Sequence, residues 1–359
     1  MEQKFKKETA DTQTETGPKV LTIAPNHNGY GGIATVIDGY RRSFADFTYL
    51  PTNNPRGLVP GVLLFMRALA VMPFYRLRGY SIAHVHVATG KSYFRKMIVL
   101  GIARLLGYKT IYHNHAGGIR AFVERAGKKR ICRTLHKCDA VIVLGNVWKK
   151  YFEEELGCKR VYIVNNFVEP LDREPGAPVA GEVIQLLFIG KICDNKGIYD
   201  LLEALERHRD EFEGRVKVRF AGPGETEKLT DHISSHNLGG MAEYIGCIEG
   251  ESKDAELRRC DALVLPSHFE GMPMVLLEAA NYGRACISTR VGSVDEIVDD
   301  GQTGRLVPPH SPEELADAIR HYLNNRGALA EDGRRARQKV KSFYPDAVEA
   351  CLKKIYREL

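Results

Sequence analysis

The sequence predicts an α/β protein with two doubly wound parallel sheets, each in its own domain. Strand-type and helix-type hydrophobic periods alternate along the chain in two separate series. Residues 165–182 between these series have no period and contain three prolines, two glycines and four carboxylates, as is typical of an interdomain linker. A chain of 359 residues is also longer than one hydrophobic core usually supports.

The first series begins with the strand Lys19–Ala24, followed by a glycine-rich turn and a helix from about Ile33. Short apolar runs of strand length recur in both series. The further strands predicted are 81–88, 109–113, 139–144 and 161–164 in the first series, and Val183–Ile189, Arg215–Ala221, Ala242–Ile245, Ala262–Leu265, 285–288 and 304–307 in the second. Ser311 and Pro312 indicate a helix start, with serine as the N-cap and proline at the first helical position.

We therefore expect two Rossmann-like domains, an N-terminal one over 18–170 and a C-terminal one over 183–344, joined by a linker at 171–182. Residues 1–17 are rich in Lys, Glu and Thr and lack an apolar run, so we expect a disordered tail rather than a signal peptide. The amphipathic segment 345–359 is expected to form a helix that joins the N-terminal domain.

The charge differs between the two halves of the chain. Residues 1–170 carry 26 Lys and Arg against 12 Asp and Glu, and the remainder carries 25 against 33. Ten basic residues and no carboxylate lie between Asp46 and Glu124, so this half should attract anions. The eight cysteines form no CxxC pair, which favours a reducing, cytoplasmic setting.

One apolar stretch, Pro60 to Pro73, could contact a membrane. Twelve residues lie between these prolines and include Arg67. A helix of that length covers roughly 18 Å, less than the ~30 Å hydrocarbon core. We expect it not to span a bilayer; it is either an interfacial anchor beside an anionic surface or an ordinary core helix with a basic face.

The segment Leu263–Ala280 carries the strongest candidate site, because an apolar strand leads through a short turn directly into a helix. Glu270 lies in the turn and Glu278 lies on the helix among apolar neighbours, where a buried carboxylate needs a partner. Helix N-termini bind anions, so the turn and the first N–H groups are candidates to hold a phosphate: Gly271, Met272, Met274 and Val275. The alternative is a loop carboxylate and a solvated helix position.

Three other clusters accompany this segment. Lys191 and Lys196 follow the first strand of the second series, where open α/β sheets bind ligands, and could neutralise a diphosphate or simply be solvated. Gly31 and Gly32 belong to a glycine turn that is not G-x-G-x-x-G, which disfavours a nicotinamide cofactor. The histidines alternate on two strands without a carboxylate or thiolate companion, so packing is favoured over metal binding: His84, His86, His113 and His115. His115 ends its strand and is the best placed to touch a substrate.

Residues 183–325 resemble the retaining glycosyltransferases of family 4, which have the GT-B architecture. The likeness rests on the EX7E pair Glu270 and Glu278 and on the segments FIGKICDNKGIYDLLEAL, FAGPGE, YIGCIEG and CDALVLPSHFEGMPMVLLEAANYGRACISTRVGSVDEIVDDGQTGRLVPP. The N-terminal half is similar more loosely, through NGYGGIATVI, HVHVA, His115 and Asn166. Two departures are Lys191, where arginine is common, and Gly292-Ser293 in place of Gly-Gly.

The resemblance implies an enzyme that moves a sugar from a nucleotide diphosphate sugar, UDP- or GDP-linked, to an acceptor. It implies that Glu278 binds the ribose, Glu270 the donor sugar, and Lys191 and Lys196 the diphosphate. Gly31 and Gly32 would approach the diphosphate from the other domain, and His115 would lie beside the transferred sugar. No cofactor and no essential metal are expected, and the sequence contains no D-x-D triplet.

We expect the acceptor to be a lipid-linked or polysaccharide-precursor glycan at the cytoplasmic face of the plasma membrane. Two other classes share the sequence features: a nonhydrolysing nucleotide-sugar epimerase and a noncatalytic nucleotide-sugar-binding protein. Nucleic acid is not expected as a partner, because the basic half lacks a long basic ribbon interleaved with aromatic residues.

Overall fold

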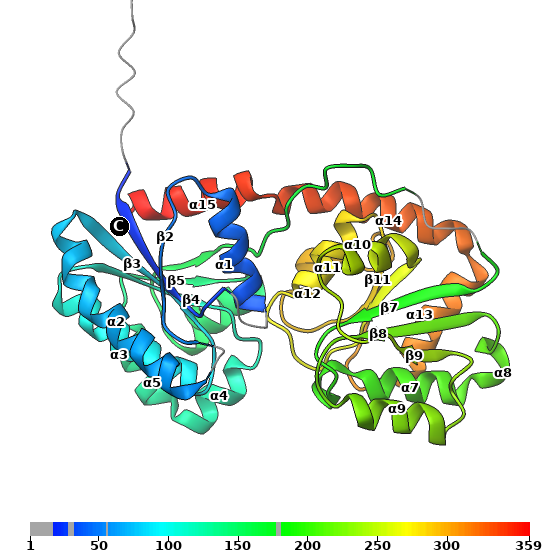
Figure 1. The fold of residues 1–359 in the computed structure, drawn as a ribbon. Helices are drawn as coiled ribbons and strands as arrows, with labels where there is room; N and C mark the ends of the chain where they lie inside the picture. Colours follow the sequence, from blue (N-terminus) through cyan, green and yellow to red (C-terminus); the bar gives the residue numbers. More distant parts are fainter. Residues whose placement is uncertain (1–16, 28–31, 55–56, 177–180) are drawn as a thin grey trace, which may run out of the picture.

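The computed structural model describes residues 17–27, 32–54, 57–176 and 181–359. It contains two six-stranded, fully parallel sheets, each covered by helices and lying side by side as two domains (Figure 1). The predicted α/β class with two doubly wound sheets is therefore confirmed. The predicted disordered tail lies almost entirely outside the described residues.

The first sheet has the strand order β2-β1-β3-β4-β5-β6. Its strands are β1 (Lys19–Ala24), β2 (Thr48–Pro51), β3 (Tyr80–Val87), β4 (Lys109–Asn114), β5 (Ala140–Val143) and β6 (Val161–Ile163). Its helices are α1 (Gly32–Ser43), α2 (Leu58–Leu77), α3 (Lys91–Leu105), α4 (Ile119–Ala126), α5 (Lys128–Leu135) and α6 (Asn146–Lys150), the last continuing into a π-helical turn at Tyr151–Glu155. The sequence analysis missed β2, because a four-residue edge strand that contains a proline carries little periodic signal.

The second sheet has the order β12-β11-β10-β7-β8-β9. Its strands are β7 (Ile184–Ile189), β8 (Val216–Ala221), β9 (Ala242–Tyr244), β10 (Ala262–Leu265), β11 (Ala285–Thr289) and β12 (Gly304–Val307). The following helices are α7 (Ile198–Arg207), α8 (Arg209–Phe212), α9 (Thr226–Ser235), α10 (Gly250–Arg259), α11 (Met274–Asn281), α12 (Val294–Ile297), α13 (Pro312–Asn324), α14 (Arg326–Val340) and α15 (Pro345–Arg357). Short 3-10 turns form at Asp194–Lys196 and Lys341–Phe343.

The C-terminal helix α15 returns from the second domain to the first (Figure 1). Its buried side chains Val348, Leu352 and Ile355 pack in one apolar cluster with residues of α1 and of the first sheet, including Ile37 and Ile111. Burial of these side chains ties the end of the chain to the first domain, since each large apolar side chain removed from water contributes roughly 1.5–3 kcal/mol.

Two helices of the second domain begin beside a proline. Pro273 is the N-cap of α11 and has extended backbone, and the helix begins at Met274. Ser311 is the N-cap of α13 as predicted, yet its hydroxyl makes no capping hydrogen bond and instead donates to the carbonyl of Pro309.

The apolar helix α2 is longer than its prolines suggested. Pro60 falls in the first turn, where a missing N–H removes no helical hydrogen bond, and Pro73 lies inside the helix. The expected length limit was therefore wrong: Val59–Leu77 is long and apolar enough to cross a membrane by length and composition alone. In this fold α2 contacts β2, β3 and α3 and buries Ala68 and Met72 against the domain.

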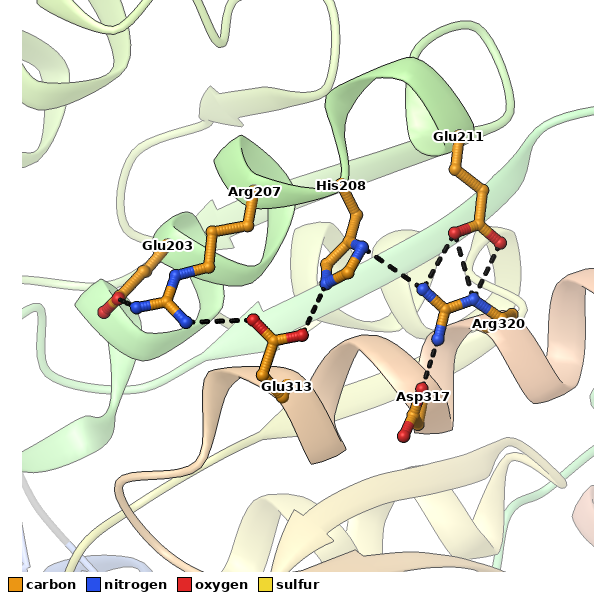
Figure 2. A network of polar contacts seen from close by, with 7 residues as sticks. All are labelled: Glu203, Arg207, His208, Glu211, Glu313, Asp317 and Arg320. Carbon is orange, nitrogen blue, oxygen red and sulfur yellow. Dashed lines mark hydrogen bonds and ion pairs between the residues drawn. The ribbon is translucent and has the colours of Figure 1, made fainter.

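A polar network joins α13 to α7 and α8 on the second domain (Figure 2). Arg320 places its guanidinium on both oxygens of Glu211, with Nε–Oε1 and Nη2–Oε2 distances of 2.9 and 2.8 Å. Glu313 accepts from Arg207 at 2.9 Å and lies 2.8 Å from the ring of His208. Hydrogen bonds from Arg320 lower the pKa of the Glu211 carboxyl.

This network predicts a pH-dependent effect of Arg320→Met. Because the folded-state pKa of Glu211 is lowered, the pair stabilises the protein above the pKa of an unfolded glutamate, and the contribution disappears as the pH falls through the folded value. We expect a loss of roughly 0.5–1 kcal/mol at pH 7 for this half-exposed pair and a smaller loss at pH 3.5, measured by urea unfolding. Arg125→Met, an exposed arginine that bonds only its own helix, is the control; equal losses at both pH values would contradict the assignment.

Candidate functional site

A cleft of about 890 Å³ lies between the two domains. Because all strands in each sheet are parallel, its walls are the loops at the carboxyl ends of the strands. The cleft brings together nearly all of the residues singled out in the sequence: Gly32, His115, Lys191, Lys196, Glu270, Gly271, Met272, Met274, Val275 and Glu278. Gly31 lies outside the described residues.

Glu270 and Lys196 form an ion pair at the centre of the cleft. The Lys196 Nζ lies 2.5 Å from the Glu270 Oε1, and the two side chains are 23% and 10% exposed. Lys196 ends the 3-10 turn that follows β7, whereas Glu270 lies in the turn between β10 and α11. The pair therefore holds two strand-end loops of the second domain together.

Gly197 explains how Lys196 reaches this position. Its φ is +67°, and a Cβ at this position would lie 1.9 Å from the carbonyl oxygen of Pro266. Only glycine fits this left-handed, crowded position. The close packing of the turn against the end of β10 brings Lys196 next to Glu270.

Glu278 has a cation partner that the sequence analysis did not identify. The Lys253 Nζ lies 2.8 Å from the Glu278 Oε1, and Lys253 also lines the cleft. Lys253 belongs to α10, a highly charged helix in which no sequence signal distinguishes this lysine from its neighbours. The partner explains how a carboxylate with 15% exposure is accommodated on the otherwise apolar helix α11.

Glycines let the two domains touch beside these pairs. A Cβ on Gly117 would lie 2.2 Å from the carbonyl carbon of Glu270, and one on Gly271 would lie 2.8 Å from the carbonyl oxygen of His115. Gly292 has a φ of +58°, and its Cβ would meet the carbonyl oxygen of Glu270 at 2.0 Å. Backbone from both domains thus packs around the turn that carries Glu270.

Side chains of the first domain also bond to this turn. The amide Nδ2 of Asn166 donates to the carbonyl of Met272 at 2.8 Å, and the indole N–H of Trp148 donates to the carbonyl of Gly271 at 3.4 Å. From the second domain, the Ser293 N–H donates to the same Gly271 carbonyl at 2.9 Å. Ser293, which stands where the related enzymes have glycine, therefore stabilises this turn through its backbone N–H. The replacement of Gly-Gly by Gly292-Ser293 is thus compatible with the turn.

The start of α11 offers backbone donors to the cleft. The helix begins at Met274. The N–H groups of Met274 and Val275 therefore have no helical carbonyl one full turn earlier to which they could donate. Both residues line the cleft. An anion bound here would gain these donors and the positive end of the helix dipole.

The histidines form a buried row that ends at the cleft. The His84 Nδ1 lies 2.7 Å from the hydroxyl of Tyr356 on α15, and its Nε2 lies 3.0 Å from the His113 Nδ1. The His86 Nδ1 lies 2.8 Å from the His115 Nε2. Burial lowers the pKa of all four rings, to about 3 for His84 and His115, so the row is neutral near pH 7.

Three of these rings lie close enough to share a metal ion. The ligand atoms of His84, His86 and His113 are within 4.8 Å of one another. Both nitrogens of His84 are already in hydrogen bonds, and the His84 and His113 planes are nearly parallel at 12°. An ion here would have to break these bonds and turn the rings, so the arrangement fits packed imidazoles better than a preformed metal site.

Comparison with known proteins identifies the second domain. Residues 172–341 match the family model "Glycosyl transferases group 1". A 161-residue segment is 34% identical to glycogen synthase of Mycobacterium tuberculosis, and it covers 45% of this chain and 39% of that protein. An uncharacterized glycosyltransferase of Methanocaldococcus jannaschii is 25% identical over 303 residues, which cover 78% of this chain and 84% of that one.

Two solved structures share the whole fold. Sucrose-phosphate synthase from Thermosynechococcus elongatus superimposes with a TM-score of 0.76 at 17% identity, over 95% of this chain and 98% of that one. Anabaena HepE in complex with UDP gives a TM-score of 0.76 at 14% identity, over 95% and 100%.

The matched segment spans well under half the length of the glycogen synthase relatives. The structural likeness covers nearly the whole chain and shows the GT-B fold, whereas the family match is confined to the domain that carries both acid–lysine pairs. Residues 172–341 are therefore similar to the group 1 glycosyltransferases, within a chain of GT-B fold.

Proposed function

We propose that this protein is a retaining glycosyltransferase that moves a sugar from a nucleotide diphosphate sugar, UDP- or GDP-linked, to a glycan acceptor. The observation that carries the proposal is the pairing of Lys196 with Glu270 and of Lys253 with Glu278 in one cleft, beside the free N-terminus of α11. This arrangement offers cations and N–H donors to a diphosphate, and carboxylates to the hydroxyls of a ribose and a sugar.

Each protein group has a distinct task in this mechanism. Glu278 accepts hydrogen bonds from the ribose and Glu270 from the donor sugar, while Lys191, Lys196 and the α11 N–H groups bind the diphosphate. Negative charge grows on the leaving diphosphate as the glycosidic bond breaks, so donors that are already in place stabilise the transition state more than the ground state. We expect no essential metal, because these fixed cations and N–H groups supply the charge stabilisation.

The donor would replace the internal partners of both carboxylates. Without ligand, each lysine satisfies an acid that is largely buried. With the donor bound, Lys196 can turn toward the diphosphate while sugar hydroxyls take its place on Glu270, so neither charge is left unpaired. His115 lines the same cleft. Its neutral ring can accept a hydrogen bond from the sugar or donate one to it, but does not act as an acid near neutral pH.

The acceptor side of the molecule favours a membrane location. Eleven large apolar side chains of the described residues are exposed, and nine of them form what we call the α2–α3 patch: Val59, Val62, Leu63, Met66, Phe74, Leu77, Phe94, Ile98 and Leu105. Exposed basic residues of the same two helices and the turn after α2 are Arg67, Arg78, Lys91 and Arg104. Exposed apolar side chains together with exposed cations on the same helices suit the interface of an anionic bilayer.

We therefore propose a lipid-linked or polysaccharide-precursor glycan as acceptor, reached at the cytoplasmic face of the plasma membrane. The same cleft would also suit a nonhydrolysing nucleotide-sugar epimerase or a noncatalytic binding protein. The match to the group 1 model over 172–341 favours a transferase. Product analysis separates the three, since an epimerase releases free epimer and a binding protein gives no turnover.

The first prediction from the proposed function concerns the two acid–lysine pairs. Lys196→Ala and Glu278→Ala should each lower sugar transfer by about 10²-fold or more, because each removes a group that binds the donor in the transition state. Lys217→Ala, on β8, is the matched control. Transfer is measured with the donor that gives the largest thermal stabilisation in a panel of UDP- and GDP-sugars. Folded Lys196 and Glu278 variants that transfer sugar at the parental rate would exclude this site.

The second prediction concerns pH. The folded pKa of His115 is about 3, so His115 does not change charge between pH 5 and 8. His115→Gln should lower turnover by the same factor at every pH in this range. A ratio of parental to variant turnover that changes tenfold around pH 6.5 would show that His115 titrates during the reaction.

The third prediction concerns the membrane. Leu63→Glu with Met66→Glu places two carboxylates on positions that are 66% and 57% exposed, so folding should be unaffected. We expect the parental chain to float with anionic liposomes and much less with neutral ones, and the double variant to lose flotation. A second double variant, Gln302→Glu with Gln338→Glu on the other domain, should float normally. Equal, negligible binding of the parental chain to both vesicle types would remove the membrane proposal.

A further inference from the structure

Arg95 and Lys96 are two adjacent cations on α3 without an acidic partner. The sequence has no carboxylate between Asp46 and Glu124, and among the described residues neither side chain forms an ion pair. Arg219, a buried arginine of the second domain, differs in this respect because it pairs with Glu256.

Lys96 is the more deeply buried of the two, with no exposed surface. Its ammonium donates one hydrogen bond, to the hydroxyl of Thr52 just after β2, and Thr52 in turn donates to the carbonyl of Ala24 at 3.0 Å. Burial and the neighbouring Arg95 lower the pKa of Lys96 well below its usual value. An ammonium in this position lacks hydrogen-bond acceptors and a counter-charge, which an anion would supply.

Arg95 lines a small cavity of about 150 Å³ between α3 and the start of α2. The Arg95 Nε is buried and makes no hydrogen bond, and the Ser92 hydroxyl, nearly one turn earlier on α3, is also buried without a partner. Native proteins satisfy most buried donors. Arg95 lines the cavity, whereas Ser92 and Lys96 are not among its lining residues. The unsatisfied Arg95 donor is therefore the one that an acceptor in the cavity would meet, with the charge of the adjacent Lys96 behind it.

We propose that this cavity is a second anion-binding site, in which Arg95 binds the phosphate or diphosphate of a lipid-linked acceptor and the buried charge of Lys96 adds to the attraction. This assignment rests on the proposed transferase function and specifies its acceptor. A phosphate ester supplies several acceptor oxygens and the negative charge that both cations lack.

The position of the site suits an acceptor with a lipid chain. Val62 and Phe65 of α2 line the same cavity, and Val62 belongs to the α2–α3 patch, so an isoprenyl chain leaving the cavity would meet apolar surface. The cavity lies at the carboxyl end of β2, and His115 follows β4 at the same edge of the sheet. Three strand spacings separate β2 from β4 in the order β2-β1-β3-β4, roughly 14 Å. A sugar attached to the bound phosphate would extend along this edge toward the cleft.

The test measures binding of farnesyl diphosphate, inorganic pyrophosphate and farnesol to the full-length chain by calorimetry. Saturating UDP or GDP, whichever stabilises the protein, fills the donor site. We expect farnesyl diphosphate to bind, and Arg95→Met and Lys96→Met each to weaken that binding at least tenfold. Arg125→Met, an exposed arginine of equal charge change, should bind it as the parental chain does.

Three results would overturn the site or its ligand. If Arg95→Met binds farnesyl diphosphate with the parental affinity, the site is excluded. If Lys96→Met does not fold, the result for Arg95→Met is sufficient by itself. Equal affinity for inorganic pyrophosphate would show a site for free phosphate rather than for a lipid ester, and equal affinity for farnesol would show binding by the patch alone. Failure of UDP and GDP to bind any variant would count against the proposed transferase and would leave the farnesyl diphosphate comparison as an independent result.

Discussion

The close backbone contact around Glu270 is the constraint on which the cleft depends. Gly117 of the first domain and Gly292 of the second pack against the main chain at this residue, and any larger side chain would collide with it. Hydrogen bonds from Asn166, Trp148 and Ser293 bind the following two carbonyls. Both domains thus hold one turn in place, and that turn directs a carboxylate at Lys196 and leads into the N-terminus of α11.

The electrostatics of the cleft follow from this geometry. Each carboxylate of the EX7E pair is mostly buried and is balanced by a lysine from another element of the second domain. Such pairs contribute little net stability, because desolvation offsets much of their attraction. In our proposal these pairs matter because the donor can replace them. The hydroxyls of the donor bind the carboxylates while its diphosphate binds lysine, so the donor binds and aligns the charged groups in one step.

The first domain differs from the second in the pairing of its charges and in its exposed apolar side chains. The cleft face of the second domain carries acids and lysines in pairs. In contrast, α2 and α3 expose apolar side chains among basic residues, and among the described residues the buried Lys96 has a hydroxyl as its hydrogen-bond partner. A membrane surface and an acceptor phosphate would together account for the exposed apolar area and for the unsatisfied donors. In this proposal the two domains divide the substrates: the paired charges bind the soluble donor, and the unpaired cations bind the lipid-linked acceptor.

The sequence by itself determined the α/β class, eleven of the twelve strands, and the local motifs around Lys196, Glu270 and Glu278, because alternating periods and strand–turn–helix junctions are encoded locally. It did not reveal β2, the full length of α2, or Lys253 as the partner of Glu278, since these depend on edge pairing, packing and long-range contact. Lys253 is separated from Glu278 by 25 positions and looks like any other lysine on a charged helix. Only the tertiary structure could show which cations meet an acid and which, like Arg95 and Lys96, do not, because that depends on groups brought together from separate parts of the chain.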